Sequence, residues 1–290
     1  MSIPEIQWYP GHIAKAEKAL LEQLKRVDVV LEVRDARIPL ATHHPLMDRW
    51  VGDKGKVLVL NRVDMISKDA RTAWEDWFRD QDERPVFTNA QQGKGVKAIA
   101  KVAQAAGETV NQRRKARGMK PRPVRAVVIG FPNVGKSALI NRLLNRKVVE
   151  SARRAGVTRQ LRWVRMSAEL DLLDAPGVIP TRLDNQDAAL KLAICDDIGE
   201  AAYDTQRVAA TFLDLVKELQ TPHPEEPYLQ NLQERYGLDL SLHTGEGFLA
   251  ELAAQKFQHD SERAAQRILN DFRTGLLGQW SLEWPPQSQS

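Results

Sequence analysis

The sequence of 290 residues has a single cysteine, Cys195, and no apolar run that approaches the roughly 20 residues of a membrane span. One cysteine excludes an internal disulfide and a cysteine-based zinc cluster, and we expect it to be a small buried side chain. The N-terminus, MSIPEIQWYPGH, lacks the basic-then-apolar form of a signal peptide. We therefore expect a cytoplasmic protein that does not bind membranes, and we separately expect a monomer.

Acidic side chains are scarce in one part of the chain. Residues 101–165 hold 17 lysines and arginines and only two acidic residues, whereas residues 183–290 hold 8 basic and 18 acidic residues. The basic segment, which includes Arg113, Arg114 and Lys115, predicts a polyanionic partner, most simply RNA. The alternative is a solvated helix face whose charge is balanced by acidic neighbours in the folded protein.

Short apolar runs alternate with amphipathic stretches in the first part of the chain. The patterns predict strands over residues 27–33, 56–60, 85–88, 124–129, 161–166 and 169–173, the last two as a hairpin, and helices over residues 14–24, 67–80 and 96–110, followed by a charged connector over residues 111–122. This alternation predicts an α/β domain over residues 1–182, with a mainly parallel sheet and helices on both faces.

The pattern becomes wholly helical after residue 182. Amphipathic stretches predict helices over residues 186–195, 205–219, 228–236, 247–257 and 261–272. We interpret residues 183–290 as a separate all-helical domain that binds RNA or the ribosome. Its last helix leaves Arg263 and Arg267 one turn apart, with Arg273 following, and these three arginines are a second candidate RNA contact.

Residues 124–141, VRAVVIGFPNVGKSALIN, change from an apolar strand to a glycine loop and then to a helix. Gly130, Gly135, Lys136 and Ser137 match the phosphate-loop pattern G-x4-G-K-[ST] in the strand and helix context that the pattern requires. Backbone N–H groups hold the phosphates in such a loop, while the lysine reaches the β and γ phosphates and the serine hydroxyl binds Mg²⁺. The predicted nucleotide contacts are Asn133, Val134, Gly135, Lys136, Ser137 and Ala138.

Asn61 and Asp64 follow the predicted strand 56–60, at the end of a strand where α/β sheets place ligands. Such a pair reads guanine, because the aspartate accepts from N1–H and the exocyclic amine while the asparagine braces the loop and N7. Adenine lacks that pair of donors. The alternative is an ordinary strand-to-helix turn, where both residue types are common.

The region after the phosphate loop has the features of a nucleotide switch. Asp174, at the end of the predicted strand 169–173, is expected to hold the water shell of Mg²⁺, and the Gly177 N–H is expected to meet the γ-phosphate. Thr158 is expected to supply a second ligand to Mg²⁺ when a triphosphate is bound.

These motifs occur in a rotated order. A GTPase usually presents the phosphate loop, the switch threonine, Asp-x-x-Gly, the guanine pair and a Ser-Ala-Lys-like loop, in that sequence. Here the guanine pair at 61–64 and a small-residue loop at 89–91 precede the phosphate loop at 130–137, Thr158 and the Asp-x-x-Gly motif. The order indicates a circularly permuted GTPase domain, which keeps its core because chain ends can be rejoined at surface loops.

The sequence resembles the RbgA/YlqF family of circularly permuted ribosome-assembly GTPases along nearly its whole length. The matching stretches are WYPGH at 8–12, DARIP at 35–39, NRVD at 61–64, GFPNVGKS at 130–137, AGVT at 155–158, DAPG at 174–177 and DFRTGLLG at 271–278. The resemblance implies GTP binding and hydrolysis, and a role in late maturation of the bacterial large ribosomal subunit. It also implies that the helical domain contacts ribosomal RNA.

Several positions differ from the family pattern. Arg62 replaces the usual lysine of the guanine motif, and its stem is expected to pack along the base. Asn89 replaces a serine, and the neighbouring Ala90 N–H is expected to reach guanine O6. Ala138 replaces a threonine without removing a ligand. Because the helical domain is acidic, we expect the main RNA contact on residues 101–165.

The usual water-positioning glutamine is absent, because Val178 occupies its place and has no hydrogen-bonding group. The resemblance nominates His12 as the catalytic residue beside Lys136, and an imidazole can orient water and take its proton. The alternative is that His12 belongs to a structural or RNA-contacting arm. By the same resemblance, Asn133 matches a position that helps to bind K⁺.

Two other functions are compatible with a phosphate loop. One is a metabolic kinase or ATPase, against which the guanine pair argues. The other is a non-enzymatic switch that binds GTP and RNA but rarely hydrolyses GTP, which Val178 would favour.

Overall fold

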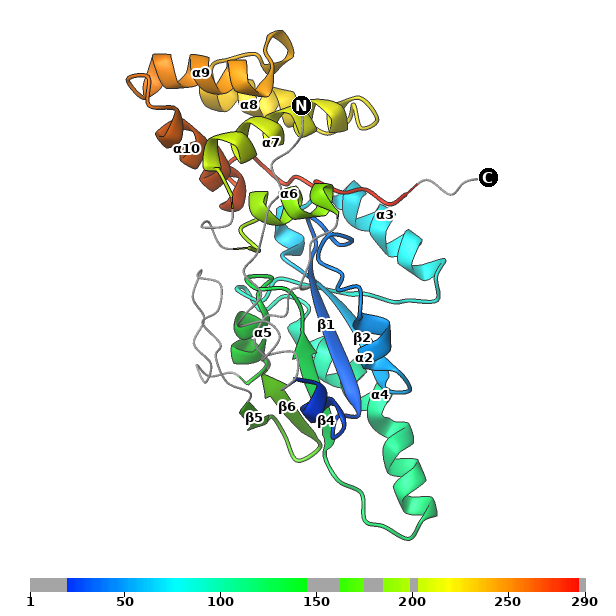
Figure 1. Ribbon diagram of the computed structural model, residues 1–290. Helices are drawn as coiled ribbons and strands as arrows, with labels where there is room; N and C mark the ends of the chain where they lie inside the picture. The colour runs from blue at the N-terminus through cyan, green and yellow to red at the C-terminus, as the bar shows by residue number, and fades with distance from the viewer. Residues whose placement is uncertain (1–19, 145–161, 175–184, 199–202, 287–290) are drawn as a thin grey trace.

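The computed structural model describes residues 20–144, 162–174, 185–198 and 203–286. A six-stranded sheet runs through these residues in the order β3-β2-β1-β4-β6-β5 (Figure 1). Neighbouring strands are parallel, except that β5 is antiparallel to β6. The strands are β1 (Val29–Asp35), β2 (Gly55–Asn61), β3 (Val86–Thr88), β4 (Val124–Ile129), β5 (Arg162–Arg165) and β6 (Leu170–Asp174). The predicted parallel sheet and terminal hairpin are confirmed.

Helices cover both faces of this sheet. Alternate side chains of a strand point to opposite faces, so neighbouring residues of one strand pack against different helices. Leu31 of β1 shares a hydrophobic cluster with Ile99 on one face, whereas its neighbour Val30 packs with Trp50 on the other. Trp74 is fully buried on that second face. The helices of this part are α2 (Met47–Val51), α3 (Lys68–Arg79), α4 (Val96–Ala116) and α5 (Lys136–Leu143).

Helix α4 is longer than its periodicity predicts. The pattern predicts a helix over residues 96–110 and then a connector, whereas the helix continues to Ala116. Arg113, Arg114 and Lys115 therefore form the last turn of α4, where basic side chains complement the negative end of the helix dipole. These basic side chains favour the helical conformation of the last turn, although the apolar face of the helix has already ended.

The remainder of the described chain is helical, as predicted. It contains α6 (Gln186–Ile194), α7 (Thr205–Gln220), α8 (Tyr228–Tyr236), α9 (Gly245–Lys256), α10 (Ser261–Arg273) and the short 3₁₀ turn η3 (Leu240–Leu242). Side chains cap four of the helix starts: Asn185, Asp204, Thr244 and Asp260 each accept a hydrogen bond from a backbone N–H in the first turn. Among the described residues, no helix has the length and apolar character needed to cross a bilayer.

The helical part and the sheet share one hydrophobic cluster. Val33 of β1 and Ile38 of the loop after it belong to the same cluster as Ile194 of α6, Phe272 of α10 and Trp280. The division of the chain between residues 182 and 183 stays a prediction, because this core continues across it.

The segment after α10 returns to the sheet and is bonded to it. The backbone N–H groups of Leu282 and Glu283 both donate to the Arg37 carbonyl oxygen. The Glu283 carboxylate accepts the N–H groups of Leu40 and Ala41, at 2.7 and 3.2 Å, from the loop after β1. This tail therefore completes the first domain although it comes last in the chain.

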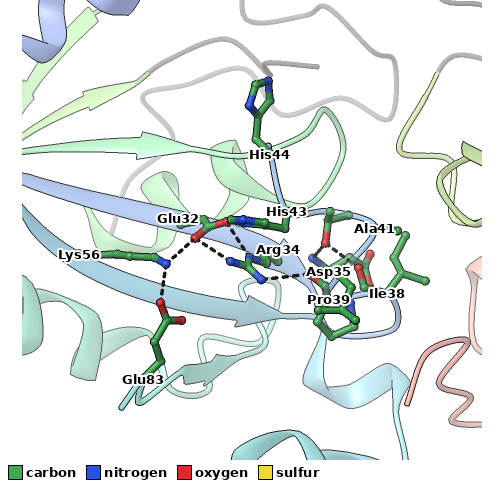
Figure 2. Close-up of polar contacts among 12 residues, drawn as sticks. Glu32, Arg34, Asp35, Ile38, Pro39, Ala41, His43, His44, Lys56 and Glu83 are labelled. Atoms are coloured by element: carbon green, nitrogen blue, oxygen red, sulfur yellow. Dashed lines mark hydrogen bonds and ion pairs between the residues drawn. The ribbon is translucent and has the colours of Figure 1, made fainter. Parts of the chain in front are cut away.

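A row of charged side chains lies across the face of β1 and β2 (Figure 2). Glu32 is fully buried; it accepts a hydrogen bond from Arg34 Nε at 2.7 Å and lies 2.7 Å from His43 Nδ1. Lys56 Nζ lies 3.5 Å from Glu32 and 2.5 Å from Glu83. Because each charge in this row has a partner of opposite sign, the free-energy cost of burying it is lower than that of burying it alone.

This row makes acid unfolding depend on Glu32. Burial raises the pKa of Glu32, but the hydrogen bond to His43 and the Arg34 guanidinium outweigh it and lower the pKa from 4.5 to about 2. The carboxylate thus contributes stability that is present above pH 4.5 and is lost as the pH falls towards 2.

We expect Glu32→Gln to remove this pH dependence. The difference in pKa corresponds to about 3 kcal/mol of unfolding free energy. Urea unfolding measured between pH 2 and pH 5 should therefore show a shallower loss of stability for the variant. Identical slopes for the two proteins would contradict the assignment.

Candidate nucleotide-binding site

The phosphate loop follows β4 and ends where α5 begins. Both motif glycines are required by their surroundings: a Cβ on Gly130 would lie 2.2 Å from the Val33 carbonyl oxygen, and one on Gly135 would lie 2.2 Å from Asn61 Nδ2. Gly135 also has a φ of +99°, which side chains disfavour. Lys136, the first residue of α5, is buried, and its Nζ donates to the Phe131 carbonyl oxygen at 2.6 Å. The lysine ammonium therefore lies against the inside of the loop.

Asn61 connects three segments of the site. Its amide nitrogen donates to the Val134 carbonyl oxygen of the phosphate loop at 2.8 Å. Its amide oxygen accepts from the Thr88 hydroxyl at 3.1 Å and from the Ala90 N–H at 3.0 Å. The side chain is 3% exposed, so these bonds form away from water. Asn61 therefore braces the loop that follows β3 against the phosphate loop, in agreement with the bracing role that the sequence predicts.

The loop after β2 is held in an unusual backbone conformation. Arg62 has a φ of +64°, in the left-handed region, and begins the 3₁₀ turn η1 (Val63–Met65). Its guanidinium donates to the Asn133 carbonyl oxygen at 2.6 Å and lies 3.3 Å from the Asp35 carboxylate. Asp64 is exposed, and its backbone carbonyl accepts from Gln279 Nε2 at 3.0 Å. The Arg62 contacts fix the loop while the Asp64 side chain is directed towards solvent.

Two residues of the loop after β3 form local hydrogen bonds. The Ala90 N–H donates to the Asn61 amide oxygen, so it takes part in the bracing network. Asn89 closes its own turn, because its side-chain oxygen accepts the Gln92 N–H at 2.9 Å. The contact of the Ala90 N–H with guanine O6 stays a prediction.

Several predicted site residues cannot be placed. His12, Thr158 and Gly177 lie outside the described residues, as does Val178. Asp174 is the last residue of β6 and pairs with Val128 of β4, so its backbone lies at the carboxyl edge of the sheet beside the phosphate loop. This is the edge where α/β sheets bind ligands.

The predicted RNA contacts are only partly exposed. Arg113 and Lys115 are exposed at the end of α4, whereas the Arg114 guanidinium donates to the Lys120 carbonyl oxygen. Arg263 and Arg267 are exposed on α10, and Arg267 Nε lies 3.1 Å from Asp271. These side chains stay candidates for phosphate contacts.

Arg273 does not belong to an RNA-contacting face. Its guanidinium donates to the carbonyl oxygens of Ile194 and Ala193 at 2.9 Å and to the Tyr203 hydroxyl at 2.8 Å. It therefore joins α10 to the last turn of α6, where carbonyl groups lack partners within the helix. The prediction for Arg273 is wrong, because spacing along the helix does not reveal that α6 ends beside it.

A buried ion pair beneath the guanine loop was not assigned a function from the sequence. Asp35 and Arg37 are both fully buried and form two hydrogen bonds, at 3.0 and 2.8 Å. Burial raises the pKa of Asp35, but Arg37 and Arg62 outweigh it and hold the pKa below its ordinary value. The signal in the sequence was the run RDAR at residues 34–37, which puts three charged residues directly after a predicted strand that is mainly apolar.

The ion pair also reaches the end of α6. Arg37 donates to the Cys195 carbonyl oxygen at 3.3 Å, and Asn133 of the phosphate loop donates to the Asp196 carbonyl oxygen at 2.6 Å. Asp197 is fully buried, and burial together with Asp35 raises its pKa well above the ordinary value. Cys195 is buried, as predicted. The nucleotide loops therefore contact the helical part directly.

The fold and this site define the class of the protein: it is a P-loop GTPase with circularly permuted motifs. The family model described as "50S ribosome-binding GTPase" matches residues 125–235. The ribosome biogenesis GTPase A of Bacillus pumilus is 33% identical over 288 residues, covering 97% of this chain and 99% of the relative. That of Bacillus cereus is 32% identical over 288 residues, covering 97% and 95%. The chain belongs to the ribosome biogenesis GTPase A family.

The arrangement of the chain is similar to a solved structure. The GNP-bound YlqF from T. maritima superposes with a TM-score of 0.63 at 23% identity, covering 93% of this chain and 98% of that one. At this identity the similarity supports the fold alone. Membership in the family supports GTP binding and hydrolysis, and it favours neither a metabolic kinase nor a non-enzymatic switch.

Proposed function

We propose that this GTPase acts in late maturation of the large ribosomal subunit, with the precursor particle and its ribosomal RNA as partners. The names of the relatives support a role in ribosome biogenesis. The observation that carries the proposal is the basic end of α4, where Arg113 and Lys115 are exposed on a helix that extends away from the sheet (Figure 1). Exposed cations of this kind bind RNA phosphates. Arg114, Arg263 and Arg267 are proposed as further contacts.

The nucleotide contacts are proposed from the site just described. Asp64 binds the guanine N1–H and amine, with Asn61, Arg62 and Asn89 shaping the loops around the base. The phosphates lie against the backbone and side chains of Asn133, Val134, Gly135, Lys136, Ser137 and Ala138, with Gly177 at the γ-phosphate. The Asn61 bonds to Val134 and Ala90 support this arrangement, because they hold the base loops and the phosphate loop together.

The residues of the site fit a magnesium ion. Mg²⁺ prefers oxygen ligands, and the Ser137 hydroxyl at the start of α5 and Asp174 at the adjacent strand end offer oxygen donors. Ser137 and Thr158 are proposed as direct ligands, with Asp174 on the water shell. Bound Mg²⁺ neutralises charge on the β and γ phosphates. A K⁺ ion at Asn133 would take the amide oxygen, because the amide nitrogen donates to Asp196.

Turnover on the ribosomal particle tests the proposed function. We expect slow hydrolysis by the protein alone, because Val178 cannot position water, and a rise of about tenfold or more when large subunits order the switch loops. Steady-state phosphate release with and without purified large subunits measures it, and small subunits are the control. Equal rates in the three reactions would refute the proposal.

His12 is proposed as the residue that orients the attacking water. We expect His12→Ala to lower single-turnover hydrolysis by about 100-fold, the usual size of a lost general acid or base. The affinity for GTP should stay nearly unchanged, since the imidazole acts on water rather than on the nucleotide. His43→Ala is the control. It also removes a histidine, but this histidine is bonded to Glu32 and is given no role in hydrolysis. A His12 variant with normal turnover would remove the assignment.

A further inference from the structure

A surface pocket lies on the edge of the sheet formed by β4, β6 and β5. It is lined by Arg26, Arg125, Trp163 and Asp171 and has a volume of about 230 Å³. Pockets that enclose a whole small molecule usually measure about 300–1,000 Å³. The size therefore suits one unit of a polymer that lies across the surface.

Trp163 is the aromatic residue of this pocket, and it is 36% exposed. Its indole N–H donates to Gln23 Oε1 at 3.3 Å, which fixes the edge of the ring. The Arg125 guanidinium carbon lies 5.9 Å from the ring centroid. An exposed indole held at its edge and beside a guanidinium is the kind of platform on which proteins stack unpaired nucleobases.

The charges around the pocket leave an excess of positive charge. Asp171 lies 2.9 Å from Arg165, and Asp28 is paired with Arg122 at 2.6 Å. Among the described residues, no carboxylate forms an ion pair with the Arg26 or Arg125 guanidinium, although the Arg125 backbone N–H donates to Asp28. Both guanidinium groups are therefore available to phosphates on either side of a stacked base.

The pocket also lies at the same end of the molecule as the basic end of α4. Arg125 is the second residue of β4 and Arg26 lies just before β1, so both arginines lie at the amino-terminal edge of these strands, and the end of α4 extends below that edge in Figure 1. The phosphate loop follows the opposite, carboxyl edge of β4. Arg122, in the segment that leads from α4 to β4, is anchored to Asp28 just before β1. RNA that contacts α4 can thus reach the pocket without covering the nucleotide site.

We propose that Arg26, Arg125 and Trp163 form a binding site for one unpaired nucleobase of a single-stranded RNA segment. The base stacks on Trp163, and the two arginines bind the flanking phosphates. This inference rests on the proposed function, because it assumes that RNA is the partner, and it adds a site where that RNA is held by stacking rather than by charge alone.

Binding of a short fluorescein-labelled oligouridine RNA tests the site. We expect Trp163→Ala to weaken binding by about fivefold or more, since stacking on an aromatic side chain contributes at least that much per base. Trp163→Phe should retain most of the affinity because it keeps an aromatic ring. Repeating the titration over a series of KCl concentrations separates stacking from charge. Arg26→Ala and Arg125→Ala should each reduce the salt slope by about 0.7, whereas Trp163→Ala should leave it unchanged.

The matched control is Arg71→Ala, which removes another arginine that lies over an aromatic ring, 5.0 Å from Phe87, on α3. GDP affinity and thermal unfolding of each variant show that the nucleotide site and the fold are intact. If Trp163→Ala binds RNA as tightly as the unchanged protein, the site is refuted while the proposed function stands. A Trp163→Ala variant that loses affinity for large subunits but not for RNA would point to a protein partner and would also refute it. If the unchanged protein binds neither RNA nor large subunits, the proposed function itself fails.

Discussion

Replacing Asp35 with alanine is expected to lower the unfolding free energy by about 3–5 kcal/mol, the usual cost of leaving one member of a buried ion pair unpaired. The substitution strands the fully buried Arg37 guanidinium and removes the carboxylate that holds Arg62. Because Arg62 in turn binds the phosphate loop at Asn133, GDP affinity should fall as well. Urea unfolding measures the first effect and calorimetric titration of GDP the second.

The chain offers a matched control for this experiment. Asp28→Ala breaks the pair with Arg122, whose side chain is 26% exposed and can therefore be rehydrated. This variant should lose less stability than Asp35→Ala and keep its GDP affinity. Replacing Asp35 and Arg37 together by leucine and methionine should recover much of the loss, because apolar residues tolerate burial. Equal costs for Asp35→Ala and Asp28→Ala would contradict the role given to the buried pair.

Lys136→Ala is expected to weaken nucleotide binding strongly and to remove most of the turnover. A hydrogen bond between charged groups contributes about 1.5–3 kcal/mol, so affinity for GDP and GTP should fall at least about tenfold. Hydrolysis should fall further, since the same ammonium also stabilises charge that develops in the transition state. Calorimetric titration and single-turnover phosphate release measure the two effects.

The control for Lys136→Ala is Lys101→Ala, which removes an exposed lysine of α4 away from the phosphate loop. It should leave both measurements unchanged. A Lys136→Ala variant with normal GDP affinity would show that the glycine loop does not hold the phosphates, and it would remove the basis for the nucleotide site.

The elements were predictable where local pattern decides structure. The strand runs, the terminal hairpin and the helices after residue 185 follow from periodicity. The rotated motif order also predicted the topology, because Asn61 and the phosphate loop must meet at one sheet edge. That meeting is seen in the bond from Asn61 to Val134.

The remaining features depend on contacts between distant segments. Arg273 caps α6, the Ala90 N–H satisfies Asn61, and Arg37 is covered by the tail after α10. None of these partners is near in sequence, so spacing alone could not reveal them. The end of α4 was missed for a different reason, since its last turn is stabilised by charge rather than by an apolar face.

The tail that binds Arg37 has a consequence for folding during synthesis. The Trp74 indole N–H donates to the Glu283 carbonyl oxygen, and the Glu283 carboxylate holds the loop after β1, so this loop acquires partners from a residue 243 positions later in the chain. The nascent chain can begin to form its sheet early, but it cannot complete the contacts of Arg37 until Leu282 and Glu283 have been made and have left the exit tunnel. Contacts between segments this far apart are also slow to form.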